Sequence, residues 1–278
     1  MVGGTHVSRA AAELREAVIA LAAEAGQAVM TVYAQDFAVE QKADDSPVTA
    51  ADLLANRIII AGLQALTPDL PVLSEESAQV GWDVRRHWRR FWLVDPIDGT
   101  REFVKRNGQF TVNIALIEEG EPVLGVVQAP VDGRVWHAVS GQGACLRADG
   151  RDQPLQVRQP ATAPLQVAVS RSLHSPRGER LLARMGQVET LRLGSSLKFC
   201  RIAEGAVDVY PRLGQTSEWD TGAGQCVLEA AGGQVLCLHD GRPFRYNQRK
   251  TLLNGEFIAL GDASLPWQQW RDDSESDA

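Results

Sequence analysis

The sequence predicts an α/β protein whose N-terminal half is α+β and whose C-terminal half is α/β. The first half combines helical periods with alternating strands and hairpin turns, which are typical of an antiparallel meander. In the second half strands and helices alternate, which predicts layers around a partly parallel sheet. A polar, proline-containing stretch at 148–164 separates the two patterns. We therefore expect one continuous domain built from halves at 1–160 and 161–278.

The composition indicates a globular protein with a sizeable core. Hydrophobic residues make up 44% of the 278 residues and charged residues 23%, which are ordinary proportions for a soluble protein. The net charge of −7 argues against a nucleic-acid partner. A small phosphorylated substrate remains open, because bound divalent cations reverse the local field.

Cysteine usage and hydropathy predict a cytoplasmic protein. The four cysteines form no C-x-x-C pair, so we expect free thiols in a reducing compartment rather than a zinc site or a disulfide framework. The N-terminus has no basic stretch followed by an apolar core, which a signal peptide would need. No apolar run approaches membrane-spanning length, so no transmembrane segment is expected.

Two helices are expected before the first strands. Apolar residues recur at helical spacing over 14–32, which predicts a helix with one buried face. A second helix should begin at Thr49, where a hydroxyl cap is followed three residues later by Asp52. A short strand at 71–73 then runs into the acidic sequence S-E-E-S at 74–77.

The strand at 91–94 is followed by the loop on which the functional prediction depends. We expect this strand to end at Asp95, because Pro96 cannot donate to a sheet ladder. Asp98 brings a second carboxylate back to the same place, and Gly99 permits a tight turn or a close ligand approach. Two acids and a hydroxyl at a strand end suit a hard cation and a phosphate.

The other elements follow the same two patterns. In the first half we expect strands at 110–116, 123–127, 135–139 and 144–147. In the second half we expect strands at 165–170, 190–193, 207–210 and 235–238, and helices at 176–185, 195–204 and 221–231.

A set of acidic residues predicts a magnesium site. Magnesium prefers oxygen ligands from a few carboxylates and keeps room for water and substrate phosphate. The candidate ligands are the side chains of Asp95 and Asp98, the backbone carbonyl of Ile97, Glu75 at the end of another strand, and Asp220 at a helix start. Each acid taken alone is explained as well by an acidic turn or a helix cap, so the metal interpretation depends on the whole set. Glu76 stays an alternative to Glu75.

Asp52 and Thr100 form a second candidate pair. In the functional interpretation, Asp52 accepts a hydrogen bond from Thr100, and Thr100 orients and deprotonates a water whose pKa a cation has lowered. The structural alternative is that Asp52 only caps its own helix.

Gly194-Ser195-Ser196-Leu197-Lys198 is a third feature. A Gly-Ser turn that opens a helix presents free N–H groups to an anion, and Lys198 adds a positive charge. A plain serine cap explains the same residues equally well. The basic run at 85–90 is interpreted as a solvated face, and His174 alone as a histidine of a surface loop.

Three motifs together resemble the signature of the inositol monophosphatase-like family of magnesium-dependent, lithium-sensitive phosphatases. They are L-S-E-E at 73–76, D-P-I-D-G-T at 95–100 and W-D-T-G-A-G at 219–224, in the order in which the family carries them. Further stretches resemble the family's bacterial 3′(2′),5′-bisphosphate nucleotidases: D-D-S-P-V-T-A-A-D at 44–52, R-N-G-Q-F-T-V-N-I-A-L at 106–116, G-S-S-L-K-F-C at 194–200 and Y-P-R at 210–212. The resemblance runs from about residue 10 to residue 260.

The resemblance implies a layered αβαβα sandwich of the sugar-phosphatase type. It implies hydrolysis of adenosine 3′,5′-bisphosphate to AMP and phosphate in support of sulfur assimilation, with two or three Mg²⁺ ions per site. The implied metal ligands are Glu75, Asp95, Ile97, Asp98 and Asp220, and the residues that activate water are Thr100 and Asp52. The implied substrate contacts are Glu75, Ile97, Asp98, Gly99, Thr100, His174, Gly194, Ser196, Lys198 and Asp220.

Two rival functions remain at this point. One is an inositol-monophosphate or sugar-bisphosphate phosphatase with the same chemistry, against which Lys198 argues. The other is a catalytically silent binding protein, which would lack one of the acids or Thr100, whereas all are present. The resemblance also allows peripheral association with the cytoplasmic face of the inner membrane and predicts no oligomeric state.

Overall fold

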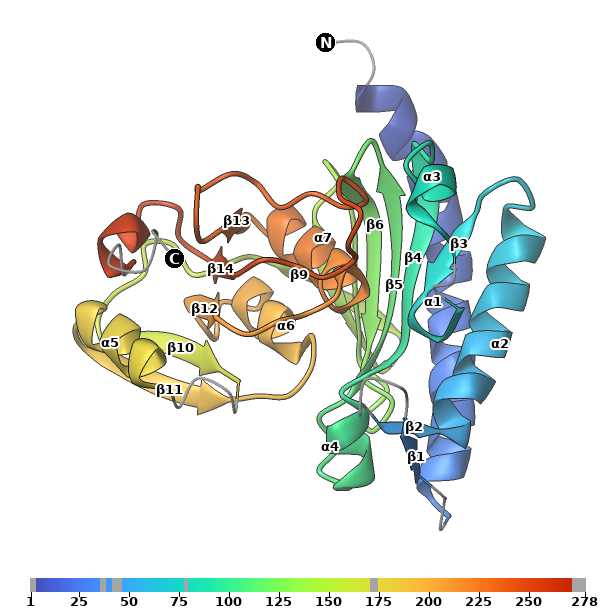
Figure 1. Ribbon diagram of the computed structural model, residues 1–278, viewed down its shortest axis with the longest axis horizontal. Coiled ribbons are helices and arrows are strands. Elements are labelled where there is room, and N and C mark those ends of the chain that lie inside the picture. Colours follow the sequence, from blue (N-terminus) through green and yellow to red (C-terminus); the bar gives the residue numbers. More distant parts are fainter. Residues whose placement is uncertain (1–3, 36–38, 42–46, 78–79, 171–174, 272–278) are drawn as a thin grey trace.

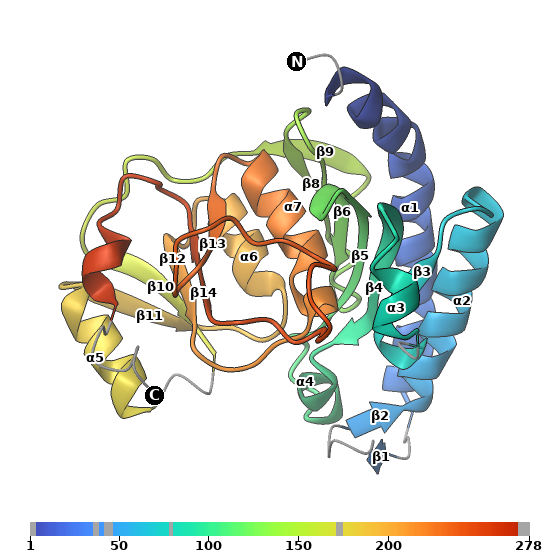
Figure 2. The same ribbon diagram turned by 45° about the horizontal axis from the view of Figure 1, so that its top comes forward.

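The chain folds into alternating layers of helices and sheets. The computed structural model describes residues 4–35, 39–41, 47–77, 80–170 and 175–271. Two long helices cover one face of a seven-stranded sheet, two shorter helices lie between that sheet and a five-stranded sheet, and a last helix covers the outer face of the second sheet (Figure 1). The turned view in Figure 2 also places α6 and α7 between the two sheets. This arrangement confirms the predicted α/β class and the αβαβα layering.

The first half supplies the long helices and the larger sheet. Its helical elements are α1 (Gly4–Tyr33), α2 (Ala50–Leu66), the 3₁₀ turn η1 (Glu75–Ser77), α3 (Trp82–Arg85) and α4 (Thr100–Val104). Its strands are β1 (Val39–Gln41), β2 (Pro47–Thr49), β3 (Val72–Ser74), β4 (Arg90–Asp98), β5 (Thr111–Glu118), β6 (Glu121–Gln128), β7 (Val135–Val139), β8 (Ala144–Ala148) and β9 (Arg151–Leu155). Strands β3 to β9 form the larger sheet in chain order. Strands β4 to β8 are the antiparallel meander that was predicted, and β9, which was not predicted, extends it by one strand.

The second half supplies the smaller sheet. Its helical elements are α5 (Pro176–Arg184), α6 (Leu197–Ala203), the 3₁₀ turn η3 (Glu218–Asp220), α7 (Gly222–Ala230) and the 3₁₀ turn η4 (Trp267–Trp270). Its strands are β10 (Leu165–Val169), β11 (Val188–Arg192), β12 (Val209–Arg212), β13 (Gln234–Cys237) and β14 (Phe257–Leu260). The strand order is β11-β10-β12-β14-β13, with β10 parallel to β11 and β12, and β14 antiparallel to its neighbours. The expected partly parallel sheet is therefore present.

The first two helices behave as their sequences predict. Val18, Ala25 and Val29 on α1 are fully buried against the larger sheet. Helix α2 begins after Thr49, whose side-chain oxygen accepts a hydrogen bond from the backbone of Ala51, while Asp52 completes the capping box. The apolar periodicity thus becomes the core between this helical layer and the sheet.

The predicted end of the strand before the acidic loop is wrong. Strand β4 continues through Pro96 to Asp98, with Asp95 opposite Asn113 and Asp98 opposite Thr111. Two residues of β4 therefore lie opposite one residue of β5, which is a β-bulge. Proline is tolerated there because the ladder is already interrupted at the bulge. The bulge places both carboxylates on a paired strand instead of a loop.

The basic run is not a fully solvated face, and its first residue corrects that interpretation. The Arg85 side chain is 2% exposed and donates to Asn247 Oδ1 and to the carbonyl oxygen of Lys250. Burial lowers the pKa of Arg85, and the charge of Glu218 opposes this shift. Arg85 therefore anchors α3 to the C-terminal segment, whereas Arg86 and Arg89 are exposed as expected.

Among the helices of the described residues, none combines the length and the apolar character that a bilayer crossing requires. All four cysteines are free, with Cys200 and Cys226 buried.

Candidate metal and phosphate site

Three carboxylates from two parts of the chain converge beside the bulge. Asp95 and Asp98 come from β4, and Asp220 comes from η3 in the second half. One carboxylate oxygen of each lies within 4.8 Å of the others. Asp220 is held by its own capping box, in which its Oδ2 accepts from the backbone N–H of Ser217 at 2.8 Å. The fold thus forces acidic groups together that would separate in a flexible loop.

The electrostatics of this cluster fit a divalent cation. Asp95 is 1% exposed, and within the described part of the chain its Oδ1 has no hydrogen-bond partner. Burial raises the pKa of Asp95 well above its ordinary value, and the charges of Glu75, Asp98 and Asp220 raise it further. Burial and the charge of Asp98 raise the pKa of Asp220 to about 7. Buried carboxylates that repel one another and include an unpartnered oxygen are a donor set for a hard ion.

Glu75 lies beside this cluster of carboxylates. Two cavities open at the site, and Glu76 lines neither of them. Strand β3 pairs in parallel with β4 up to Ser74 and Val94, so Glu75 leaves β3 next to Asp95. A cavity of about 350 Å³ is lined by Glu75 together with Asp98, Thr100 and Asp220. This placement favours Glu75 over Glu76, and ligation by Glu75 remains a prediction.

The contacts that the two interpretations of Asp52 require are both present, one at each carboxylate oxygen, and the activation of water stays a prediction. Oδ2 accepts hydrogen bonds from the backbone N–H and the hydroxyl of Thr49, which caps α2. Oδ1 lies 3.2 Å from Thr100 Oγ1, which is also 3.2 Å from the carbonyl oxygen of Ile97. The hydroxyl at the start of α4 thus has the buried carboxylate of Asp52 and the carbonyl of the bulge as alternative acceptors.

Two glycines allow the halves of the molecule to meet at the site. Gly99 has a φ of 92°, a conformation that favours glycine. Gly194 donates its N–H to Gln109 Oε1 at 2.8 Å, and a Cβ at Gly194 would lie 2.5 Å from the carbonyl oxygen of Gln109. Any larger residue at Gly194 would therefore push the second half away from the loop that precedes β5.

Ser196 connects the carboxylates across the two halves, and its side chain does not form the serine cap that was the structural alternative for this turn. It precedes α6 but makes no side-chain cap. Its Oγ lies 2.8 Å from Asp98 Oδ2 and 2.8 Å from the carbonyl oxygen of Asp220, and it accepts a hydrogen bond from Asn113 Nδ2 at 2.9 Å. Ser196 is 1% exposed, so its hydroxyl is engaged in these contacts within the protein. The sequence predicted that Ser196 contacts the substrate, and this role stays a prediction.

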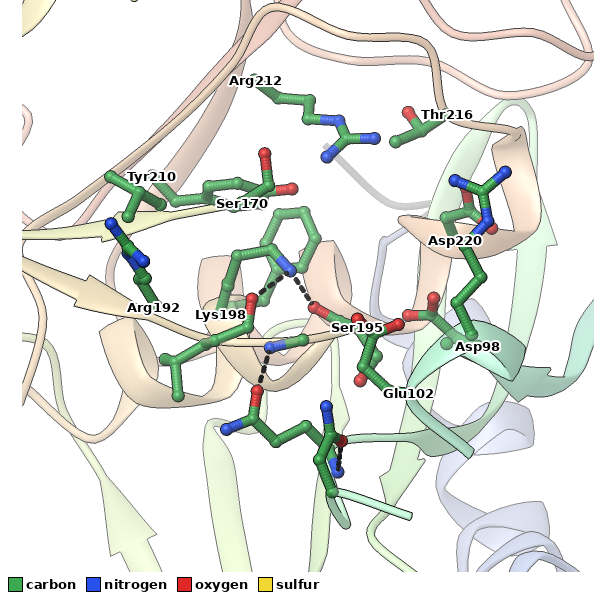
Figure 3. A pocket seen from close by; sticks show the side chains of 18 of the residues that line it. Asp98, Glu102, Ser170, Arg192, Ser195, Lys198, Tyr210, Arg212, Thr216 and Asp220 are labelled. Atoms are coloured by element: carbon green, nitrogen blue, oxygen red, sulfur yellow. Dashed lines mark hydrogen bonds between the residues drawn. The ribbon is translucent and has the colours of Figure 1, made fainter. Parts of the chain in front are cut away.

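Lys198 places a cation in the larger cavity, next to the acids (Figure 3). This cavity has a volume of about 610 Å³. The Lys198 ammonium donates to the carbonyl oxygens of Ser195 at 2.6 Å and Leu193 at 3.2 Å and lies 5.1 Å from the ring centre of Tyr210. Burial lowers its pKa to about 8, and the charge of Asp98 opposes the shift.

The larger cavity is lined by acidic and by basic side chains, and Arg101 lines both cavities together with Asp98 and Asp220. Figure 3 shows Asp98 and Asp220 on one side and Lys198 and Arg192 on the other, with Arg212 above. Both cavities are lined by Asp98, Gly99 and Asp220, so they share the acidic wall. A ligand with two anionic groups fits this cavity. One group would bind cations that the carboxylates hold, and the other would bind the basic side chains.

The structure does not test every residue named from the sequence. His174 lies outside the described residues. Several residues that shape the site were not assigned a role: Gln109, Asn113, Arg192 and Arg212. Asn113 carried a usable signal, because it is a polar residue inside the otherwise apolar strand V-N-I-A-L. Arg192 carried none, because a basic residue at a strand end is ordinary.

Lowering the pH of the metal-free chain from about 8 to about 5 is expected to raise its melting temperature. The folded-state pKa values of Asp95, Asp98 and Asp220 are raised, mainly by burial. Their contribution to stability is therefore complete below the ordinary value of 3.8 and is lost as the pH rises through about 7, the folded value of Asp220. Thermal unfolding in a chelator across this range measures the effect.

The control for this prediction is the variant Asp220→Asn, which should flatten the pH dependence. Saturating magnesium should also flatten it, because the ion replaces protons as the partner of the carboxylates. Asp262, whose pKa is lowered to about 2 by hydrogen bonds that outweigh its burial, titrates below this range. A melting temperature that falls steadily from pH 8 to pH 5 would contradict the electrostatic account of the site.

Comparisons with known proteins cover nearly the whole chain. The model of the inositol monophosphatase family matches residues 10–268. The 3′(2′),5′-bisphosphate nucleotidase CysQ of Escherichia coli strain K12 is 50% identical over 244 residues, which are 86% of this chain and 96% of that protein. The protein of the same name from Haemophilus influenzae is 37% identical over 255 residues, 90% of this chain and 94% of that one.

A solved structure agrees with these sequence matches. The crystal structure of CysQ from Bacteroides thetaiotaomicron, a bacterial member of the inositol monophosphatase family, is 38% identical with a TM-score of 0.77. The match covers 88% of this chain and 96% of that chain. It includes both halves of the molecule and hence both sides of the site.

Proposed function

Because this chain belongs to the inositol monophosphatase family, we propose that it is a phosphatase that hydrolyses adenosine 3′,5′-bisphosphate to AMP and phosphate. Its relatives of about 50% identity carry the name 3′(2′),5′-bisphosphate nucleotidase, and the resemblance found from the motifs is thereby confirmed. The observation that carries the proposal is a single cavity with a carboxylate cluster on one side and Lys198 on the other. Such a nucleotidase supports sulfur assimilation.

Enzymes of this family depend on metal ions, and we propose that the ion here is Mg²⁺, with two or three ions per site. The residues that would hold them are Glu75, Asp95, Asp98, Asp220 and the carbonyl of Ile97. The bound ions would supply charge neutralisation for the phosphate and a lowered pKa for water. The oxygen-only donor set and the unpartnered Oδ1 of Asp95 support a hard cation.

Thr100 and Asp52 are proposed to position and deprotonate the attacking water. The Thr100 hydroxyl lies 3.2 Å from Asp52 Oδ1, so it accepts the proton of the water as its own proton passes towards the carboxylate. Asp52 is buried and fixed through Thr49, so its carboxylate is held within reach of the hydroxyl. Fixed positioning of a nucleophile in line with the leaving oxygen is the main protein contribution to phosphoryl transfer.

The substrate is proposed to lie along the shared cavity. The scissile phosphate would meet the backbone of Asp98, Gly99 and Thr100, and the nucleotide would extend past Gly194 and Ser196 towards Lys198. His174 is retained as a proposed contact. A neutral inositol ring would leave Lys198 without an anionic partner, which favours a bisphosphate nucleotide over an inositol monophosphate.

The test is phosphate release from a small panel of substrates in the presence of Mg²⁺. We expect turnover of adenosine 3′,5′-bisphosphate to exceed that of inositol 1-phosphate and of fructose 1,6-bisphosphate, with inhibition by lithium and loss in a chelator. Preference for either of the other substrates would replace the proposed function by the rival phosphatase. Nucleotide binding without phosphate release would indicate a silent binding protein.

Replacing Lys198 with methionine is expected to raise KM for adenosine 3′,5′-bisphosphate by roughly 10- to 150-fold, since a charge-assisted contact contributes roughly 1.5–3 kcal/mol. The value of kcat should change little, because Lys198 faces the part of the substrate that does not react. Steady-state kinetics measure both. The same substitution at Lys250, which is exposed and lines neither cavity at the site, is the matched control. An unchanged KM for Lys198→Met would remove this residue from the substrate site.

We propose a cytoplasmic location for this chain. The four free cysteines support a reducing compartment. Association with the inner membrane remains a proposal from the sequence, and cell fractionation tests it.

A further inference from the structure

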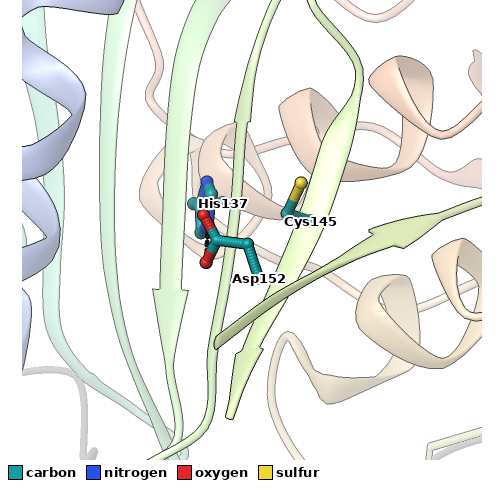
Figure 4. Close-up of side chains that lie close together, drawn as sticks. All are labelled: His137, Cys145 and Asp152. Atoms are coloured by element: carbon teal, nitrogen blue, oxygen red, sulfur yellow. Dashed lines mark hydrogen bonds and ion pairs between the residues drawn. The ribbon is translucent and has the colours of Figure 1, made fainter. Parts of the chain in front are cut away.

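A second group of metal-binding side chains lies on the outer strands of the larger sheet. His137 on β7 and Cys145 on β8 are opposite each other in the register, and Asp152 lies on β9 (Figure 4). One potential ligand atom of each lies within 4.8 Å of the others. Strands β5 and β6 separate β7 from β4, so this group is distinct from the carboxylates of the nucleotidase site.

The donor set differs in kind from that of the catalytic carboxylates. Imidazole nitrogen, thiolate sulfur and carboxylate oxygen together are typical ligands of zinc and similar borderline ions, whereas magnesium selects oxygen alone. His137 Nε2 and Asp152 Oδ1 are 3.2 Å apart. This separation matches the edge of a tetrahedron whose metal–ligand bonds are about 2.0–2.1 Å.

The surroundings prepare two of the three groups for an ion. Burial lowers the pKa of His137 and keeps the imidazole neutral, the form that binds metals. Hydrogen bonds from Arg147 hold the pKa of Asp152 well below its usual range, so the carboxylate is ionised. Cys145 is half-buried, and burial raises the pKa of its thiol, so it remains protonated until a metal displaces the proton.

Arg147 is the charged group that such an ion would have to accommodate. It contacts both oxygens of Asp152 and also both oxygens of Glu16 on α1. Glu16 therefore neutralises the guanidinium from the other side. A metal-bound carboxylate commonly keeps an outer hydrogen-bond partner that orients it. Arg147, which donates to Asp152, would be that partner here.

We propose that His137, Cys145 and Asp152 form a second metal site, which takes a zinc-like divalent ion and ties together the strands β7, β8 and β9. Binding forms bonds from His137 Nε2, Cys145 Sγ and one oxygen of Asp152. The thiol proton leaves to solvent, and the imidazole changes to the tautomer protonated on Nδ1, because in the metal-free chain Nε2–H donates to the ionised Asp152. The exposed side of Asp152 leaves a fourth position for water. Sequence spacing does not indicate such a site, because the proposed ligands come from three strands and have no motif spacing.

The same three residue types also occur in nucleophilic catalysis, and the structure argues against that use. A catalytic cysteine has a lowered pKa, set by a nearby positive charge or a base. The pKa of Cys145 is instead raised, first by burial and then by the charge of Asp152. A metal role is therefore better supported than a reactive thiol.

The test is titration of the chelator-treated full chain with Co²⁺ in excess Mg²⁺, followed by absorption spectroscopy. We expect a thiolate-to-cobalt charge-transfer band that saturates at a single ion per chain. The band should be absent in Cys145→Ser and unchanged in Cys237→Ser, which replaces the other partly buried cysteine. Asp152→Asn keeps every thiol and should weaken the apparent affinity at least about tenfold.

Two outcomes would overturn the proposal: no charge-transfer band in the unaltered chain, or a band that persists in Cys145→Ser. A second readout is the melting temperature, which zinc should raise in the unaltered chain and not in Cys145→Ser, because an ion that binds only the folded state stabilises it. Both measurements are made in excess Mg²⁺, which competes for the carboxylates of Asp95, Asp98 and Asp220, and oxygen ligands alone give no thiolate-to-cobalt band.

Discussion

Replacing Asp95 with asparagine is expected to lower kcat/KM for adenosine 3′,5′-bisphosphate by about 10³-fold or more and to make the metal-free chain more stable. The loss of activity follows from the loss of a charged ligand, since an ion supplies several kcal/mol of transition-state stabilisation and about 1.4 kcal/mol corresponds to tenfold. The gain in stability follows from the removal of a buried carboxylate that Glu75, Asp98 and Asp220 repel.

Kinetics at saturating magnesium and denaturant melts in a chelator measure the two effects on the same preparations. The matched control is Asp149→Asn, because Asp149 is exposed and has a φ of 50°, which asparagine also adopts. Near-normal turnover in Asp95→Asn would remove this residue from the metal site. A metal-free variant that is less stable than the unaltered chain would contradict the repulsion among the carboxylates.

Replacing Thr100 with alanine is expected to lower kcat by about 10²–10⁴-fold, the usual contribution of positioned proton transfer. KM should change little, because the carboxylates and Lys198 remain. Thr100→Ser keeps the hydroxyl that lies 3.2 Å from Asp52 Oδ1 and should recover most of the rate. Steady-state kinetics of the three proteins, with magnesium affinity measured in parallel, separate the role in water activation from a role in ion binding.

Thr100 gives a cleaner test than Asp52, because Asp52 also caps α2. A substitution of Asp52 would change the capping box of α2 in addition to any catalytic effect. If Thr100→Ala kept kcat within a few-fold of the unaltered enzyme, the proposed proton path would be wrong. A similar loss in Thr100→Ser and Thr100→Ala would point to packing rather than to the hydroxyl.

The sequence predicts which carboxylates meet at the site better than it predicts the backbone structure that brings them together. The spacing of Asp95 and Asp98 indicated a shared cation, but Pro96 suggested a strand end. Only the pairing with β5 on both sides of Pro96 shows that the segment is a bulge. Pairing partners come from distant parts of the chain, so a local pattern does not contain them.

The remaining misses have the same cause. Strand β9 is mostly exposed and includes Pro154, so it has neither an alternating pattern nor an apolar run. Strand β14 was not predicted, although it lies between β12 and β13 in the smaller sheet. Arg85 looks like one member of a basic run, and only its contact with Asn247, 162 residues away, makes it a buried anchor.

Ser196 has a consequence for how the two ligands of the enzyme influence each other. Its hydroxyl contacts the side chain of Asp98 from the first half and the backbone of Asp220 from the second, and α6 continues from it to Lys198. The spacing of the acids and the placement of Lys198 thus depend on one docking of the halves. We therefore expect the metal ion and the nucleotide to be thermodynamically linked: whichever binds first and fixes that docking should increase the affinity for the other, by the same factor in either order.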